Sequence, residues 1–257
     1  METKAIVIRV GGTNCDKETV NALNLVGFDT KLVHINELIR KEIDILDFNL
    51  LVIPGGFSFG DYISAGKIFA VELYYKLKKD LEKFISNRKN YIVGICNGFQ
   101  ILAKLGLLPN PTFKQQFTLT YNDSGRFECR WVYLKVNKNN PSVLKNLPEI
   151  IELPIAHAEG KFFCENNILD YIIENNLNLF EYCDKNGTPK NYPINPNGSI
   201  HNIAGITDLT GHIIGLMPHP ERYIIPLQHP LYHLKRNLLP YGKLFFSLIK
   251  ESILQNN

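Results

Sequence analysis

The chain has 257 residues, 28 Lys and Arg against 25 Asp and Glu, and a formal net charge of +3 at pH 7. This length allows one large domain or two small ones with a sizeable core, and the 45% hydrophobic and 21% charged residues are typical of globular proteins. The small charge balance argues against nucleic-acid or anionic-membrane partners, and no stretch approaches the roughly 18 apolar residues of a membrane span.

The cysteines and the first residues favour a reducing compartment. The five cysteines are odd in number and widely spaced, with no C-x-x-C pair and no cysteine–histidine cluster. Neither a disulfide framework nor a zinc or other metal site is therefore expected. The opening METKAIVIRV is not expected to be a signal peptide, because an arginine interrupts an apolar run of only a few residues. We predict a cytoplasmic protein.

The first hundred residues alternate between two kinds of pattern. Short apolar runs rich in β-branched residues predict buried strands, and helical periodicity predicts helices between them, the first capped by Asn14 or Asp16. Such alternation is typical of right-handed βαβ units and of a parallel sheet that binds ligands at the carboxyl ends of its strands. The predicted strands are 4–10, 28–34, 49–53 and 91–95, and the predicted helices are one ending near 26, 35–46, 62–88 and 97–106.

Beyond residue 107 the predicted strands follow one another without long helices, which favours antiparallel pairs. Residues 177–202 are rich in Asn, Pro and Gly and predict a strand followed by a long surface loop. With no repeat and no break in composition, we predict a single domain over 1–257. The further strands are expected at 117–121, 127–136, 152–158 and, as a hairpin or as neighbours, 203–206 and 212–217, and the further helices at 166–176 and 241–254.

The strongest motif lies where the strand 91–95 meets its helix. Gly94, Cys96 and Gly98 form G-x-C-x-G, the cysteine counterpart of the nucleophile elbow. A sharp strand-to-helix turn lifts one side chain out of the sheet, and glycine on each side lets neighbouring backbone approach. The helix N-terminus beside the sulfur favours thiolate over thiol. Cys96 is therefore the predicted nucleophile. The alternative is a buried structural cysteine, against which the flanking glycines argue.

A thiol nucleophile needs a base, which is usually histidine. Of seven histidines, His219 in the segment MPHPER is the most suggestive. Its two flanking prolines predict an extended segment in which His219 and Glu221 project side by side, so that Glu221 orients the ring. The alternative is a loop histidine with a solvated glutamate, and spacing alone does not decide between them.

Acyl chemistry at Cys96 also needs two backbone N–H groups that stabilise the developing oxyanion. Asn97, directly after the nucleophile, is expected to supply one. The other is expected from Gly55 or Gly56 in the segment PGG, unless that segment is merely a tight turn.

One segment that hints at a phosphate loop is set aside. Residues 60–67 (GDYISAGK) place Asp61 where the motif requires glycine, and Ile68 stands where it requires Ser or Thr. No nucleotide site is therefore expected in this chain.

Taken together, these motifs resemble those of class I glutamine amidotransferases. More closely, they are similar to the family of glutaminase subunits of phosphoribosylformylglycinamidine synthase, from purine biosynthesis. GICNGFQ and PHPE mark amidotransferases broadly, whereas NPNGS-x-x-NIAGI and PGGFS-x-GDY point to this subunit family. The matching segments are RVGGTNCDKE at 9–18, PGGFSFGDYISAG at 54–66, GICNGFQIL at 94–102, FECRWVYLKV at 127–136, LPIAHAEGK at 153–161, NPNGSIHNIAGI at 195–206 and MPHPER at 217–222.

The resemblance implies a fold and further site residues. The fold would be an α/β flavodoxin-like three-layer sandwich whose mostly parallel sheet carries an antiparallel extension. Gln100, one turn beyond Cys96, would bind the substrate, or else be a solvated helix-face residue. His157 and Glu159 match the family's AHGEG segment and would line the pocket or the partner interface, or else form a half-buried strand pair. The departures from the family pattern, none in the proposed triad, are Phe59, Ser64 and Ala158.

The implied activity is hydrolysis of L-glutamine to glutamate through a Cys96 thioester, with His219 as base and acid and Glu221 as its orienter. Ammonia would pass to an ATP-binding synthetase partner that aminates formylglycinamide ribonucleotide, with a small third subunit as an option. ATP and Mg²⁺ are expected on that partner and no cofactor in this chain. The alternatives are the same glutaminase serving another synthase, a cysteine esterase, which the order of the triad disfavours, and a non-enzymatic redox sensor.

Overall fold

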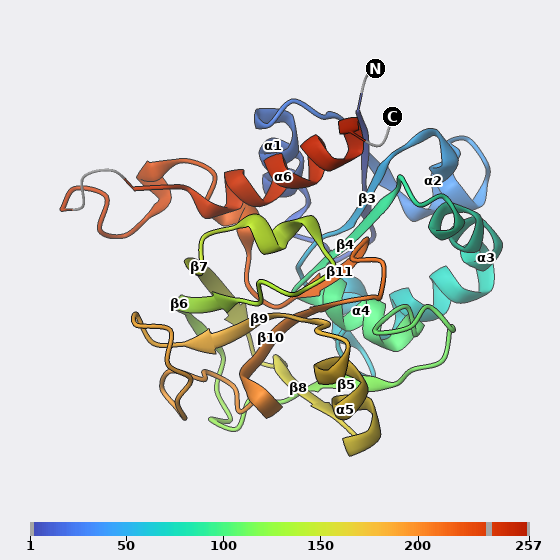
Figure 1. The fold of residues 1–257 in the computed structure, drawn as a ribbon. Coiled ribbons are helices and arrows are strands. Elements are labelled where there is room, and N and C mark those ends of the chain that lie inside the picture. Colours follow the sequence, from blue (N-terminus) through green and yellow to red (C-terminus); the bar gives the residue numbers. More distant parts are fainter. Residues whose placement is uncertain (1–2, 235–237, 256–257) are drawn as a thin grey trace.

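The computed structural model describes residues 3–234 and 238–255. A nine-stranded mixed sheet, in the order β2-β1-β3-β4-β11-β10-β9-β6-β7, runs through the molecule, and β5 and β8 form a separate pair (Figure 1). The strands are β1 (Lys4–Arg9), β2 (Asp29–His34), β3 (Leu50–Ile53), β4 (Tyr91–Ile95), β5 (Phe117–Thr120), β6 (Glu128–Val136), β7 (Ile150–His157), β8 (Lys161–Cys164), β9 (Asn178–Cys183), β10 (Ile203–Thr207) and β11 (Ile213–Leu216).

Five of these strands form the parallel half of the sheet. They run in the order β2-β1-β3-β4-β11, and each pairs in parallel with its neighbour, which is a flavodoxin-like order. Every residue of β3 and β4 is buried, as expected for strands covered on both faces. The predicted α/β class with a mostly parallel core is confirmed.

Helices cover the two faces of this half. Figure 1 shows α1 beside α6 on one face and α3 beside α4 on the other. Lys250 of α6 donates a hydrogen bond to the carbonyl of Val26, just past α1, at 3.0 Å. Among the described residues, no helix combines the length and apolarity needed to cross a membrane. The helices are α1 (Asp16–Leu25), α2 (Ile35–Ile39), α3 (Lys67–Ser86), α4 (Asn97–Leu105), α5 (Asn166–Glu174) and α6 (Tyr241–Gln255).

The rest of the sheet is an antiparallel extension. From β11 onward, β10, β9, β6 and β7 each pair antiparallel with the strand before them in the sheet, as the lack of intervening helices predicted. Below them β5 pairs with β8. The sequence did not predict β8, because its four residues KFFC form a strand only through that pairing.

Two predicted helices are shorter than expected. The helix predicted over 35–46 ends at Ile39, and Lys41 then has a positive φ of 60°. The helix predicted from 62 begins at Lys67, because Gly66 before it has φ 73°. A Cβ at Gly66 would lie 2.8 Å from Ile101 Cγ1 of α4, so glycine is needed where α3 starts against α4.

The predicted cap of the first helix is also wrong. Cys15 occupies the N-cap position of α1 and makes no side-chain capping bond. Asp16 is the first helical residue, and Asn14 lies one residue too early. The loop before α1 is instead held beside the segment after β3, because the backbone N–H of Cys15 donates to the Gly55 carbonyl at 3.3 Å.

Candidate active site

The carboxyl ends of β1, β3, β4 and β11 surround a cavity of about 230 Å³. The bend after β7, from the antiparallel extension, closes it on the other side. Its lining includes six predicted site residues, namely Gly56, Cys96, Gln100, His157, Glu159 and His219. The whole lining comes from six separated parts of the chain, which meet at the edge where open α/β sheets bind ligands.

Cys96 sits at a strained turn between β4 and α4. Its φ of 52° and ψ of −106° fall in a region that non-glycine residues rarely occupy and that clusters at functional sites. Its backbone N–H is held by the Leu216 carbonyl of β11 at 2.8 Å. A Cβ at Gly98 would lie 1.9 Å from the Ile53 carbonyl oxygen, and one at Gly94 2.6 Å from that of Gly98. The predicted elbow is present, and both glycines are sterically required.

His219 and Glu221 form the buried pair that the sequence predicted. Nδ1 of His219 lies 2.6 Å from Oε1 of Glu221, and both residues are almost completely buried, with 1% and 0% exposed. The backbone path differs from the prediction, because Pro220–Arg222 is a turn of 3₁₀ helix and not an extended segment. That turn brings the carboxylate back toward the ring.

The surroundings of His219 favour its protonated form. Burial acts to lower the pKa of the imidazole, but the Glu221 carboxylate and the Cys96 sulfur outweigh it and hold this pKa well above its usual range. Nε2 of His219 is buried and has no hydrogen-bond partner among the described residues. A proton on this nitrogen is thus available to a group in the cavity.

Gly55 lies between the predicted nucleophile and the predicted base. A Cβ at this position would lie 2.9 Å from His219 Cε1 and 3.4 Å from Cys96 Cβ. At Gly56, φ is +136° and a Cβ would lie 2.7 Å from the backbone nitrogen of Asn14. The PGG segment is therefore more than a tight turn, since each glycine makes room for a neighbour. The oxyanion role of Gly55, Gly56 and Asn97 stays a prediction.

Gln100 is buried, not the solvated residue of the alternative interpretation. Its Nε2 donates to the Glu159 carbonyl at 2.6 Å, and its Oε1 accepts from Asn97 Nδ2 at 2.9 Å. Asn97 in turn accepts from the Ser58 backbone N–H at 3.2 Å. Gln100 therefore connects α4 to the bend after β7 by a hydrogen bond. Any contact of Gln100 with substrate would be additional to this structural role.

His157 and Glu159 both line the cavity. His157 is 3% exposed, and burial lowers its pKa to about 3, so the ring is neutral at physiological pH. Its Nδ1 lies 3.1 Å from Asn122 Oδ1. Glu159 is partly exposed at the rim. The pair belongs to the cavity wall, which favours the pocket interpretation over a half-buried strand pair.

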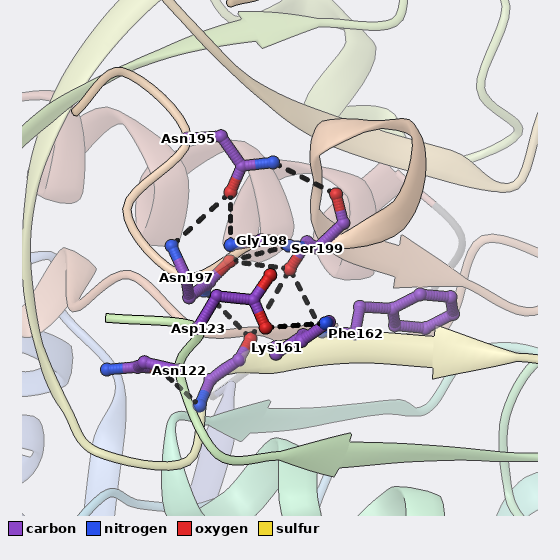
Figure 2. A network of polar contacts seen from close by, with 9 residues as sticks. Asn122, Asp123, Lys161, Phe162, Asn195, Asn197, Gly198 and Ser199 are labelled. Carbon is purple, nitrogen blue, oxygen red and sulfur yellow. Dashed lines mark hydrogen bonds and ion pairs between the residues drawn. The ribbon is translucent and has the colours of Figure 1, made fainter. Parts of the chain in front are cut away.

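A network of amide side chains holds this bend in place (Figure 2). Asn122 donates to the His157 carbonyl at 2.8 Å and accepts from the Gly160 N–H at 3.0 Å. From the opposite side, Asn197 donates to the Gly160 carbonyl at 2.8 Å and accepts from Ser199 Oγ at 2.8 Å. Buried polar groups satisfied in this way rigidify the structure around them. The NPNGS motif thus supports the cavity wall without lining the cavity.

Several lining residues were not found by reasoning from residue chemistry. Cys15 and Arg222 lie next to each other, with Arg222 Nη2 donating to Cys15 Sγ at 3.2 Å. Arg222 also bonds Glu18 Oε1 through Nε at 2.9 Å. Burial raises the pKa of the Cys15 thiol to about 11. The only sequence signal for them was their place inside matching segments. The lining residues missed are Asn14, Cys15, Phe57, Asp61, Ala65, Phe127, Ala156 and Arg222.

Comparisons with known proteins agree with this architecture. A chain of the structure of PurLQS from Thermotoga maritima is 31% identical, with all of this chain and 99% of that chain covered and a TM-score of 0.72. A glutamine amidotransferase from the same organism, 17% identical, matches at a TM-score of 0.52 over all of this chain and 98% of its own. The latter supports the fold alone.

Relatives are also found by sequence. The phosphoribosylformylglycinamidine synthase subunit PurQ of Picrophilus torridus is 50% identical over 226 residues, 88% of this chain and 89% of the relative. The subunit of the same name from Methanococcus maripaludis is 40% identical over 260 residues, 99% of this chain and 96% of the relative. The family model of the CobB/CobQ-like glutamine amidotransferase domain matches residues 2–250. The chain therefore belongs to the family of CobB/CobQ-like glutamine amidotransferase domains.

Proposed function

We propose that this chain is the glutaminase subunit of phosphoribosylformylglycinamidine synthase in purine biosynthesis. The observation that carries the proposal is the cavity itself, where a strained elbow cysteine, a buried histidine and its carboxylate meet. Relatives named as this subunit cover nearly the whole chain, and the structure of PurLQS supports the choice of synthase.

The reaction begins at Cys96. Its sulfur, as the thiolate, attacks the side-chain amide carbon of glutamine, and the proton of the thiol resides on His219 Nε2. The C–S bond forms as the carbonyl π pair moves onto oxygen, where the N–H groups of Asn97 and of Gly55 or Gly56 stabilise the charge. His219 then donates its proton to the departing nitrogen, and ammonia leaves a glutamyl thioester.

Water completes the cycle. His219, now neutral, removes a proton from water as it attacks the thioester carbon, and the returning proton leaves free glutamate and the Cys96 thiol. Glu221 keeps Nδ1 protonated and stabilises the imidazolium in both halves. The raised pKa of His219 suits the first half, in which the ring acts as an acid.

The ammonia has to reach a second site. In water at neutral pH it would become ammonium, which has no lone pair and cannot attack. The acceptor is formylglycinamide ribonucleotide, aminated on an ATP-binding synthetase partner with which a small third subunit also assembles. ATP and Mg²⁺ belong to that partner, and this chain contributes no cofactor. All five cysteines are free, which fits a cytoplasmic complex.

The test uses the complex reconstituted with its synthetase partner. Cys96→Ala should abolish glutamine-dependent synthesis while synthesis from added ammonium salt continues at the wild-type rate. Mass spectrometry of the wild-type chain during turnover should detect a glutamyl adduct on Cys96. Retention of glutamine-dependent synthesis by Cys96→Ala would falsify the assignment. If glutamate release is lost in Cys96→Ala but the synthetase does not change the rate of release by the wild type, the partner would be another synthase.

A further inference from the structure

Cys15 is a second thiol in the catalytic cavity, and the proposed mechanism does not use it. It is 1% exposed and lines the same cavity as Cys96 and His219. A Cβ at Gly55 would lie 3.1 Å from Cys15 Sγ, 2.9 Å from His219 Cε1 and 3.4 Å from Cys96 Cβ. The missing side chain of Gly55 therefore marks a point that both cysteines and the imidazole surround.

The groups around this point are ligands that zinc prefers. One ligand atom from each of Cys15, His219 and Glu221 lies within 4.8 Å of the other two, and all three residues are buried. Zinc is bound by thiolate sulfur and imidazole nitrogen in tetrahedral sites. In such sites, the second ring nitrogen of the histidine almost always donates to a carboxylate or carbonyl.

His219 already has that arrangement. Nδ1 is held by Glu221 at 2.6 Å, and Nε2 is a buried polar atom without a hydrogen-bond partner among the described residues. A ring oriented through one nitrogen and free at the other is typical of a metal-binding histidine. The same arrangement serves a general base, so the two uses of His219 compete.

We propose that Cys15 and His219 bind a Zn²⁺ ion in this cavity, with water at its remaining positions, and that the ion reversibly inhibits glutamine hydrolysis. The Cys15 thiol and the His219 imidazolium each release a proton to solvent when Sγ and Nε2 bind the metal. The ion occupies the free nitrogen of the base, so His219 can neither accept nor donate a proton there. The inhibition rests on the proposed glutaminase activity, whereas the binding of the metal does not.

The charges near the site set its expected strength. The Cys15 thiolate offsets one unit of the 2+ charge of the ion, and the neutral imidazole offsets none. The guanidinium of Arg222, 3.2 Å from Cys15 Sγ, opposes binding, although Glu18 at 2.9 Å partly offsets its charge. This balance favours a reversible inhibitory site over a permanent structural one. Sequence spacing predicted no metal because the ligands are more than 80 residues apart, and only the fold brings them together.

Metal binding can be tested on the full chain without any activity assay. Co²⁺ added to the purified, metal-free subunit should produce a thiolate-to-cobalt charge-transfer absorption band, and Zn²⁺ should displace it with one ion per chain. Cys15→Ala and Cys15→Ser should each weaken Zn²⁺ binding at least tenfold, because a zinc–thiolate bond is lost. Cys164→Ala is the matched control, since Cys164 is also buried but lies on β8, outside the cavity.

Inhibition is measured as glutamate release by the reconstituted complex at buffered free Zn²⁺. The wild type should lose activity in a way that a chelator restores. The Zn²⁺ concentration for half inhibition, measured relative to each variant's own rate, should rise at least tenfold in both Cys15 variants. Equal Zn²⁺ affinity and equal inhibition in wild type and in folded Cys15→Ser would overturn the proposal, as would a wild type that binds no Co²⁺. If neither the wild type nor any variant releases glutamate, the proposed function fails. The cobalt spectrum still shows whether the metal site exists.

Discussion

The parallel half of the sheet and its antiparallel extension contribute to the cavity in different ways. The parallel half supplies the elbow of Cys96 and, through the segment after β11, His219. The extension supplies the end of β7 and the bend after it, where His157 and Glu159 form a wall. The predicted catalytic residues therefore lie at the ends of strands that the buried core holds rigidly. The shape of the pocket depends instead on hydrogen-bonded loops.

This difference predicts distinct kinetic effects. Changes in the parallel half should lower kcat, because they displace the nucleophile or its base. Changes in the extension should mainly raise KM for glutamine, because they loosen a wall of the cavity in which we propose that glutamine binds. A variant of the extension that lowers only kcat would contradict this division.

The largest effect is expected for Glu221→Gln. The neutral amide holds the His219 ring in place but no longer stabilises the imidazolium, so kcat for glutamate release should fall by about 10³-fold. Glu18→Gln is the control, because that carboxylate pairs with Arg222 and does not contact the ring. Comparable kcat values for the two variants would refute the role of Glu221.

Asn122→Ala should affect the extension next most strongly. It removes hydrogen bonds to the His157 carbonyl and the Gly160 N–H and leaves buried groups unpaired, at a cost of about 2–3 kcal/mol in the free energy of unfolding. KM for glutamine should rise several-fold with a smaller change in kcat. Asn186→Ala, at an exposed turn, is the control and should match the wild type in steady-state kinetics and urea unfolding.

Gly98→Ala tests the packing of the elbow in the parallel half. The added Cβ would lie 1.9 Å from the Ile53 carbonyl oxygen, so the backbone has to move, which should cost about 1–3 kcal/mol. Urea unfolding measures this loss, and kcat should fall while KM stays close to that of the wild type. Gly125→Ala adds a Cβ that meets nothing within 4 Å, although its φ of 62° adds some strain. It should keep the wild-type kcat.

The pH dependence of stability tests the electrostatics of His219. Its pKa in the folded chain is raised above the unfolded value near 6.5, so protonation stabilises the fold. This contribution is fully present below about pH 6.5, declines by up to about 1.4 kcal/mol per pH unit above that, and is lost once the pH passes the folded pKa. Urea unfolding of the wild type relative to a His219→Gln, Glu221→Gln double variant should show that decline. A rising difference would mean that the folded pKa is lowered.

The smallest effect is expected at the outer edge of the extension. Asp123 forms an ion pair with Lys161 at 2.6 Å, but its side chain is 61% exposed. Asp123→Asn should therefore change the free energy of unfolding by less than about 1 kcal/mol. It should leave both kcat and KM unchanged, which separates this surface contact from the buried amide network beside it.

Sequence reasoning predicted elements well where the pattern is local and repeated. The buried runs of β3 and β4 and the helix from Asn97 follow from apolar periodicity, and the elbow follows from two glycines around Cys96. It failed where neighbours from elsewhere in the chain decide. The start of α3 depends on how closely Gly66 approaches α4, and β8 exists only because β5 lies beside it.

The sequence by itself determined the α/β class and predicted a nucleophile and the histidine–carboxylate couple, because each depends on residues within a few positions of one another. Only the tertiary structure decided which other residues surround the His219–Glu221 couple. It turned Pro220–Arg222 into a 3₁₀ turn, buried Gln100 against the Glu159 carbonyl and placed Cys15 beside His219. The physical reason is that the contacts of Gln100 and Cys15 join segments tens to hundreds of residues apart, and only the packing of the sheet and its loops sets their distances.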